Sequence, residues 1–187
     1  MRRSRDHAGT DALKRRRCID RGAVLVETAM VMPLLFALVL GVIDFGSTYN
    51  DWISVRQGAR DGLREAIVNT KPVAFGGGAW SCPIAGTQPD PGSDAMSLVC
   101  YTKLRIGLNQ ANTRVKIYFT APYTAGQAVK VCVQYATGSV SGAYAPVLNG
   151  KVLSTEVESL IEQDAPTFTA PFAETPIVAW PASCSQL

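Results

Sequence analysis

The sequence predicts an α+β protein, in which a long N-terminal transmembrane helix extends into a small head built on an antiparallel β-sheet. Residues 23–43 carry a single ionisable group and, at helical rise, are long enough to cross a bilayer core of ~30 Å. Apolar residues continue at three- and four-residue spacing through residues 44–69, which predicts an amphipathic continuation of the same helix. Three later segments, at 114–120, 129–135 and 152–161, alternate apolar and polar residues as half-buried strands do.

The segment before the apolar stretch is strongly basic. Residues 1–21 hold eight Lys and Arg against three Asp, whereas the rest of the chain has ten basic and twelve acidic residues. A short basic segment directly before a membrane span stays in the cytoplasm, so we expect an N-in, C-out topology. The segment has no apolar periodicity, and we expect a disordered cytoplasmic leader that ends at residue 22. No aromatic residues interleave with the arginines, so nucleic acid is not an expected partner.

Proline and glycine interrupt the predicted helix. Pro33 removes one backbone hydrogen bond and usually kinks a helix, which membrane helices tolerate. Four glycines each weaken an isolated helix by up to ~1 kcal/mol relative to alanine, but they also permit the close approach of another helix. These glycines are Gly41, Gly46, Gly58 and Gly62.

The expected head, residues 70–164, begins with a loop. Residues 71–92 contain three consecutive glycines and four prolines, a composition that excludes regular structure. Ser93 or Asp94 then caps a short helix that continues through Ile106. A strand over Leu98–Ile106 in place of a helix there is the alternative.

The three predicted strands each present an apolar face. Short polar or glycine-bearing loops separate them, and Asn149-Gly150 is a turn signal within one of these loops. Antiparallel pairing with one face covered by helix is the economical arrangement. The last 23 residues, 165–187, carry four prolines and are expected to form an extended tail held by Cys184.

The cysteines divide between the two sides of the predicted membrane. Cys18 lies on the cytoplasmic side, whereas the other four follow the span and face an oxidising compartment. Four cysteines allow three pairings. We favour Cys82–Cys100, which fastens the glycine-rich loop to the short helix beside it, together with Cys132–Cys184, which fastens the tail to a strand.

The sequence lacks the residue combinations that catalysis needs. The exported part has no histidine, no Cys-x-x-Cys pair and no glycine-rich phosphate loop ahead of a helix. Asp44, Asp51 and Asp61 are spaced for exposure along the helix rather than for a metal cage. We therefore expect no enzyme, no catalytic residues, no metal and no other cofactor.

A glycine, a small residue and a carboxylate mark the start of the apolar stretch. Gly22 is followed by Ala23, by three further apolar residues and then by Glu27. This arrangement resembles the processing region of type IV prepilin-like proteins. The sequences V-E-T-A-M-V-M-P-L-L, G-V-I-D-F-G and R-Q-G-A-R-D-G that follow resemble the TadE-like family, minor pilins or pseudopilins of the bacterial tight-adherence (Flp-type) pilus system. The segments V-K-V-C-V-Q-Y and A-P-V-L-N-G-K-V-L-S-T-E-V-E-S-L-I-E are similar more loosely.

The resemblance implies a type IV pilin-like fold and a structural role in the assembly of an adhesive pilus. It implies that a prepilin peptidase cleaves the leader between Gly22 and Ala23. The implied location is the bacterial cytoplasmic membrane, with the head outside the cytoplasm, and the implied partners are other pilins and the inner-membrane assembly platform. The helix-packing residues that it implies are Pro33, Gly41, Asp44, Phe45 and Gly46.

Glu27 is a charge within an apolar helix, where an unpaired carboxylate costs ~2.5–3.5 kcal/mol on insertion scales. One interpretation places it at the membrane interface, where the cost is small. The other pairs it with the free amine of Ala23 in an adjacent subunit, so that each buried charge satisfies the other. The resemblance favours this second interpretation.

Two other functions stay open at this stage. The protein could be a signal-anchored exported cell-surface protein with no pilus role, in which case the leader stays attached. It could also be an exported hydrolase on a signal anchor. The N-terminus of the mature protein separates the first alternative from a pilin, and an activity lost on replacing one head serine would support the second.

Overall fold

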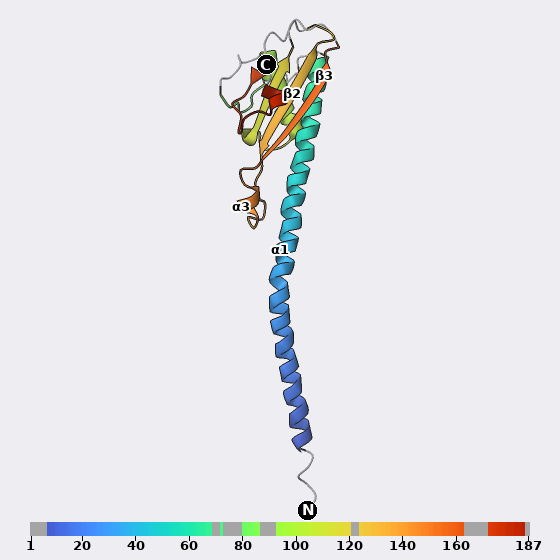
Figure 1. The fold of residues 1–187 in the computed structure, drawn as a ribbon, viewed down its shortest axis with the longest axis vertical. Coiled ribbons are helices and arrows are strands. Elements are labelled where there is room, and N and C mark those ends of the chain that lie inside the picture. Colours follow the sequence, from blue (N-terminus) through green and yellow to red (C-terminus); the bar gives the residue numbers. More distant parts are fainter. Residues whose placement is uncertain are drawn as a thin grey trace, which may run out of the picture.

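The computed structural model describes residues 7–68, 72, 80–86, 93–120, 124–162 and 172–185. One long helix, α1 (His7–Ile67), carries the head on its C-terminal third, and its N-terminal half extends away from the head (Figure 1). The rest of the described chain forms three short helices and a four-stranded antiparallel sheet. The predicted fold class, a long N-terminal helix followed by a small antiparallel sheet, is confirmed.

Helix α1 is unbroken over 61 residues and, at 1.5 Å per residue, about 90 Å long. It continues through Pro33 and ends at Ile67, near the boundary expected from sequence. Between residues 23 and 43 the helix has apolar residues on all sides, and an apolar stripe that packs on the head stabilises its last third.

The prediction of a disordered leader was wrong for the residues that the structure describes. Helix α1 begins at His7, fifteen residues before Gly22, while residues 1–6 lie outside the described part. Residues 8–17 are rich in Ala, Leu, Lys and Arg, which have high helix propensity. Because extending an existing helix needs no new nucleus, these residues continue the helix that the apolar segment forms.

Helix α2 (Asp94–Ile106) has the bounds that the sequence predicts, and the alternative strand is absent from this described segment. The Ser93 hydroxyl accepts a hydrogen bond from the Met96 amide at 3.2 Å and caps the N-terminus. Gly107, with a φ of 70°, ends the helix in the left-handed conformation that favours glycine.

The sheet has the strand order β3-β2-β1-β4 and is antiparallel at every pairing. Three strands agree with the sequence prediction to within one residue at each end: β1 (Thr113–Phe119), β2 (Ala128–Ala136) and β3 (Val152–Leu160). The remaining described elements are a 3-10 turn η1 (Gln110–Asn112), α3 (Ala145–Leu148), β4 (Phe172–Ala173) and α4 (Ala182–Ser185).

The face of the sheet that meets α1 and α2 forms the hydrophobic core. Alternation along β2 places three valines on this face, each fully buried, and β1 contributes Val115, Ile117 and Phe119. The valines are Val129, Val131 and Val133; α1 supplies Val55, Ala59, Leu63 and Ala66, and α2 supplies Leu98, Val99 and Ile106.

Two glycines of α1 allow α2 to pack closely against the α1 backbone. A Cβ atom added to Gly58 would lie 2.3 Å from Ile106 Cγ1, and one added to Gly62 would lie 2.2 Å from Thr102 Oγ1. The prediction that glycines in the long helix permit the close approach of another helix is therefore confirmed at these two positions. The neighbouring helix is α2 of the same chain.

The opposite face of the sheet is covered by the tail. Gln134 of β2 is fully buried there, and its side-chain amide donates to the Val178 carbonyl at 2.9 Å while its oxygen accepts from the Ile177 amide at 3.0 Å. Cys132, which faces the same side, is bonded to Cys184 with a Cα–Cα distance of 6.3 Å. This is the pairing favoured from sequence, and it holds the tail to the strand as expected.

The described part of the tail, residues 172–185, is more structured than the predicted extended segment. It adds an edge strand, β4, and a short helix, α4. Prolines exclude a central strand but allow a two-residue pairing at a sheet edge, so the proline count alone was misleading. Residues 163–171 lie outside the described part.

Most of the predicted loop of residues 71–92 also lies outside the described residues. Its described part is fastened at two points. Cys82 is bonded to Cys100 of α2 with a Cα–Cα distance of 5.5 Å, again the pairing favoured from sequence. The Trp80 indole donates to the Pro72 carbonyl at 2.6 Å.

A buried ion pair joins α2, the tail, β1 and the loop that contains Cys82. Lys103 Nζ lies 2.6 Å from Glu174 Oε1, both side chains are fully buried, and Nζ also donates to the Pro83 carbonyl at 2.6 Å. The Glu174 carboxylate accepts from the amides of Ala85 at 2.9 Å and Val115 at 2.7 Å. Burial lowers the pKa of the Lys103 ammonium, and its hydrogen bond to Glu174 opposes that change. Each charge thus has the partners that a buried ion pair requires.

Replacing Gly58 by alanine should destabilise the head by ~1–3 kcal/mol, because the new methyl group would overpack against backbone as well as side-chain atoms of Ile106. Gly46→Ala is the matched control. No described atom beyond the local helix backbone lies within 4 Å of that position, so helix propensity should leave stability unchanged or raise it by up to ~1 kcal/mol. Chemical denaturation of the detergent-solubilised protein measures both variants, and equal stabilities would refute this account of the packing.

Glu174→Ala should destabilise the head by ~3–5 kcal/mol, because it leaves the Lys103 ammonium buried without its counter-ion. Glu158→Ala removes a glutamate that pairs with Lys130 at the surface, at 3.2 Å, and should cost ~1 kcal/mol or less. Thermal denaturation compares the two under the same conditions. The prediction fails if the Glu174 variant is as stable as the Glu158 variant.

Candidate functional site

The part of α1 between residues 23 and 43 carries apolar side chains on every side. Each large hydrophobic side chain between Val24 and Val39 is 43–78% exposed. Water-soluble proteins rarely expose a contiguous apolar surface of this extent. From Gly22 onward α1 is long and apolar enough to cross a membrane, which is consistent with a single-pass membrane protein.

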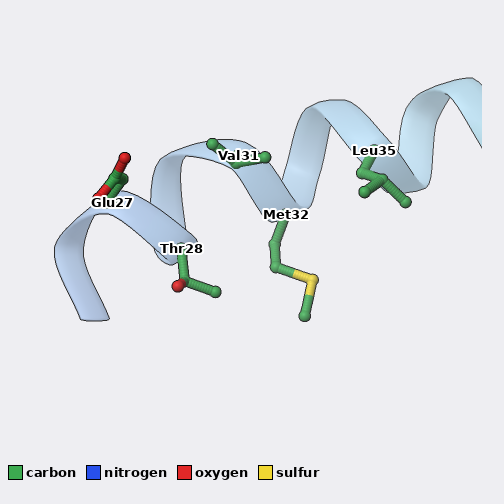
Figure 2. Close-up of a pocket in the computed structure, with 5 residues that line it drawn as sticks. All are labelled: Glu27, Thr28, Val31, Met32 and Leu35. Atoms are coloured by element: carbon green, nitrogen blue, oxygen red, sulfur yellow. The ribbon is translucent and has the colours of Figure 1, made fainter. Parts of the chain in front are cut away.

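Glu27 lies near the start of this exposed segment, beside a shallow hollow on the helix surface. The Thr28 hydroxyl donates to the Val24 carbonyl at 2.8 Å and so is satisfied within its own helix. The Glu27 carboxylate makes no hydrogen bond or ion pair within the part of the chain that the structure describes. Figure 2 shows Glu27 on the opposite side of the ribbon from Thr28 and Met32. The residues that line the hollow are Glu27, Thr28, Val31, Met32 and Leu35.

Asp44 directly follows the apolar stretch, and the loop between β2 and β3 buries it completely. Its Oδ2 accepts hydrogen bonds from the hydroxyls of Ser139 at 2.6 Å and Ser141 at 2.8 Å. Its Oδ1 accepts from the amides of Val140 at 3.1 Å and Ser141 at 2.8 Å. Hydrogen bonds to the ionised carboxylate, chiefly the one from Ser139, lower the pKa of Asp44 from 3.8 to about 2, although burial opposes them.

The same loop reaches further along α1 through Tyr144. The Tyr144 hydroxyl donates to the Ala37 carbonyl at 2.7 Å, and its ring packs on Phe45 with ring centroids 5.8 Å apart. A Cβ atom at Gly41 would lie 3.0 Å from the Tyr144 hydroxyl oxygen. Gly41 therefore leaves the space that the tyrosine occupies, one helical turn before Asp44.

The structure brings together three of the five predicted helix-packing residues. Gly41, Asp44 and Phe45 all contact the β2–β3 loop of their own chain. Pro33 and Gly46 are exposed and lie outside this cluster. A role for any of the five in packing between subunits stays a prediction.

The expectation that Asp44 is exposed on the helix was wrong. Helical spacing shows which residues of α1 share a face, but the hydroxyl that buries Asp44 lies 95 residues later in the chain. Sequence reasoning did not single out Ser139 and Ser141. A signal was present, since two serines that flank a valine in a glycine-bearing loop offer hydroxyls and consecutive amides to a carboxylate.

Metal binding finds no support in the described residues, where no three His, Cys, Asp or Glu side chains gather into a possible metal site. The four cysteines after the apolar stretch are all in disulfides.

Comparison with known proteins finds a family resemblance within helix α1. The family model described as TadE-like protein matches residues 22–64, from the start of the exposed apolar segment to the last turn of α1. No curated protein and no solved structure matches the chain. The resemblance to the TadE-like family is thus confirmed over this segment, and a TadE-like segment indicates a protein associated with the Tad pilus.

Protonation of Asp44 should release the β2–β3 loop from α1. Because the pKa of Asp44 falls from 3.8 to about 2 on folding, its contribution to stability is fully present above 3.8 and is lost as pH falls through about 2. In an NMR titration, the amide protons of Val140 and Ser141 should shift together with an apparent pKa near 2. The Gly126 amide, which donates to the Ile161 carbonyl, should not follow this titration. A titration midpoint at or above pH 3.8 for the loop amides would contradict the hydrogen bonding of ionised Asp44 by the β2–β3 loop.

Proposed function

We propose that this protein is a minor pilin, or pseudopilin, that takes part in the assembly of a tight-adherence (Flp-type) pilus as a structural component. The observation that carries the proposal is the TadE-like match to residues 22–64, which coincides with the exposed apolar part of α1. In this proposal residues 23–43 anchor the protein in the bacterial cytoplasmic membrane, with the leader inside and the head outside. The basic charge of the leader supports this orientation.

The leader is removed, in this proposal, by a prepilin peptidase that cleaves between Gly22 and Ala23. Helix α1 is continuous through both residues, so the scissile peptide bond lies within a helix of the uncleaved chain. Glycine is the residue other than proline that disfavours a helix interior most, by ~1 kcal/mol relative to alanine. Gly22 therefore lowers the cost of opening the helix at the cleavage site.

Cleavage gives Glu27 a partner. The new amine of Ala23 would be largely protonated near neutral pH, since its reference pKa is about 7.7–8.0. An ammonium and a carboxylate that are both surrounded by lipid or protein stabilise one another only if they are paired. The Glu27 carboxylate has no partner within the described part of its own chain, and the hollow beside it offers an apolar surface to a neighbouring helix. Pairing with Ala23 of an adjacent subunit would then fix the relative height of the two helices.

The proposed partners are the bilayer, other pilins or pseudopilins, the prepilin peptidase and the inner-membrane assembly platform. The long helix suits this role because it offers both a membrane anchor and a rigid mount for the head. Neither a signal-anchored surface protein without a pilus role nor an anchored hydrolase would need a peptidase site at Gly22 or a charge at Glu27.

The test compares the native protein with Glu27→Gln after expression in its own pilus system. Intact mass and N-terminal sequencing of the membrane-extracted protein should show a chain that begins at Ala23. Glu27→Gln should insert into the membrane as well as the native protein, because it removes a charge, yet co-purify with much less of the partner pilins. Glu158→Gln is the matched control, since it makes the same chemical change on the surface of the head.

Two outcomes would contradict this proposal separately. A leader that stays attached to the mature protein would exclude cleavage and favour the signal-anchored alternative. Unchanged pilus output and unchanged co-purification for Glu27→Gln would exclude the pairing of Glu27 with Ala23.

A further inference from the structure

The connection between β2 and β3 is far longer than these strands need. Ala136 and Val152 are directly paired at the ends of adjacent antiparallel strands, which a loop of ~2–5 residues can join. Here residues 137–151 intervene, and Figure 1 shows them, with α3, projecting from the end of the sheet beside α1 and toward its N-terminal half. We call residues 137–150 the foot.

The foot has a defined shape of its own. The Thr137 hydroxyl lies 3.0 Å from the carbonyl oxygens of both Leu148 and Lys151, at the neck where the foot leaves the sheet. The Ser139 amide donates to the Asn149 side chain at 2.9 Å, across the foot. Together with the four hydrogen bonds that residues 139–141 donate to Asp44, these bonds hold the foot as a rigid extension of the head.

The foot lies beside the last two turns of the apolar stretch. Tyr144 bonds to the carbonyl of Ala37, which precedes Ile43 by six residues, or about 9 Å along the helix axis. With residues 23–43 spanning the membrane, which is part of the proposed function, this contact falls at the level of the outer leaflet. The foot therefore lies where lipid headgroups meet acyl chains.

The surface of the foot suits that environment. Residues 137–150 contain no charged side chain. Val140 is 70% exposed and Val147 is 52% exposed, although Asp44, to which the foot is bonded, is fully buried. Tyr144 and the half-exposed Phe45 add aromatic rings at the same level, and such rings are enriched at membrane–water interfaces.

We propose that the foot inserts into the outer leaflet of the phospholipid bilayer, with Val140 and Val147 at the boundary between headgroups and acyl chains. The apolar span ends beside the foot, so one lipid surface covers both. Because the foot is clamped to α1 through Asp44 and Tyr144, it gives the head a second point of contact with the membrane. Two contacts fix the height and tilt of the head, which a single helix does not.

Depth-dependent fluorescence tests this placement. Val147→Cys, in a Cys18→Ser background whose other cysteines stay in disulfides, is labelled with the environment-sensitive fluorophore NBD. The full-length protein is reconstituted into phosphatidylcholine–phosphatidylglycerol vesicles with and without spin-labelled lipid. Two control positions use the same label. Leu35→Cys probes the exposed apolar part of α1, and Leu160→Cys probes an exposed leucine at the opposite end of the sheet, where it pairs with Ala128.

The foot is supported if the label at position 147 shifts its emission to the blue and is quenched by spin-labelled lipid, while the label at 160 shows neither effect. Quenching at position 35 without quenching at position 147 would contradict insertion of the foot into the bilayer, while still supporting the membrane span. A blue shift at 147 that lipid does not quench would also overturn it, because the residue would then face another protein chain. Absence of quenching at both 35 and 147 would overturn the foot together with the proposed span.

Discussion

A single continuous helix that carries both an exposed apolar segment and the head is the constraint on which this structure depends. Between residues 23 and 43 α1 exposes apolar side chains on all sides, whereas its last third is apolar on one stripe only. Because the helix is continuous, the head cannot adjust its position independently of the apolar segment. The described contacts that hold the head in place are therefore made to the same helix that carries the apolar surface.

The two ends of the head contact α1 in different ways. At the far end, small residues bring α2 and the sheet against α1, and the contact is close-packed and apolar, as Gly58 and Ala59 show. At the near end, the contact is polar and charged, because Asp44 holds the β2–β3 loop through hydroxyls and amides. The buried carboxylate accepts from four donors, and losing any of them is costly, so the contact defines one geometry.

The sequence was informative wherever structure follows from local pattern. Apolar periodicity located α1, and alternation located β1, β2 and β3; Ser93 and Gly107 marked the ends of α2. Contacts between distant segments could not be predicted in this way. Nothing near Asp44 indicates a loop almost a hundred residues away, and nothing near Lys103 indicates a counter-ion in a proline-rich tail. A sequence motif predicted the candidate site at Gly22, Ala23 and Glu27. The contacts between Asp44 and the β2–β3 loop became known only from the fold.

The position of the tail gives the head an order of completion. Glu174 and Cys184 meet partners that precede them by 71 and 52 residues, and the tail covers the second face of the sheet. A chain emerging from a ribosome or a translocation channel presents the long helix first and these residues late. Until they arrive, Lys103 lacks its counter-ion and Cys132 lacks its disulfide partner. The head can therefore complete both contacts only after the chain has emerged through Cys184. A chain interrupted before that residue cannot form the Cys132–Cys184 disulfide.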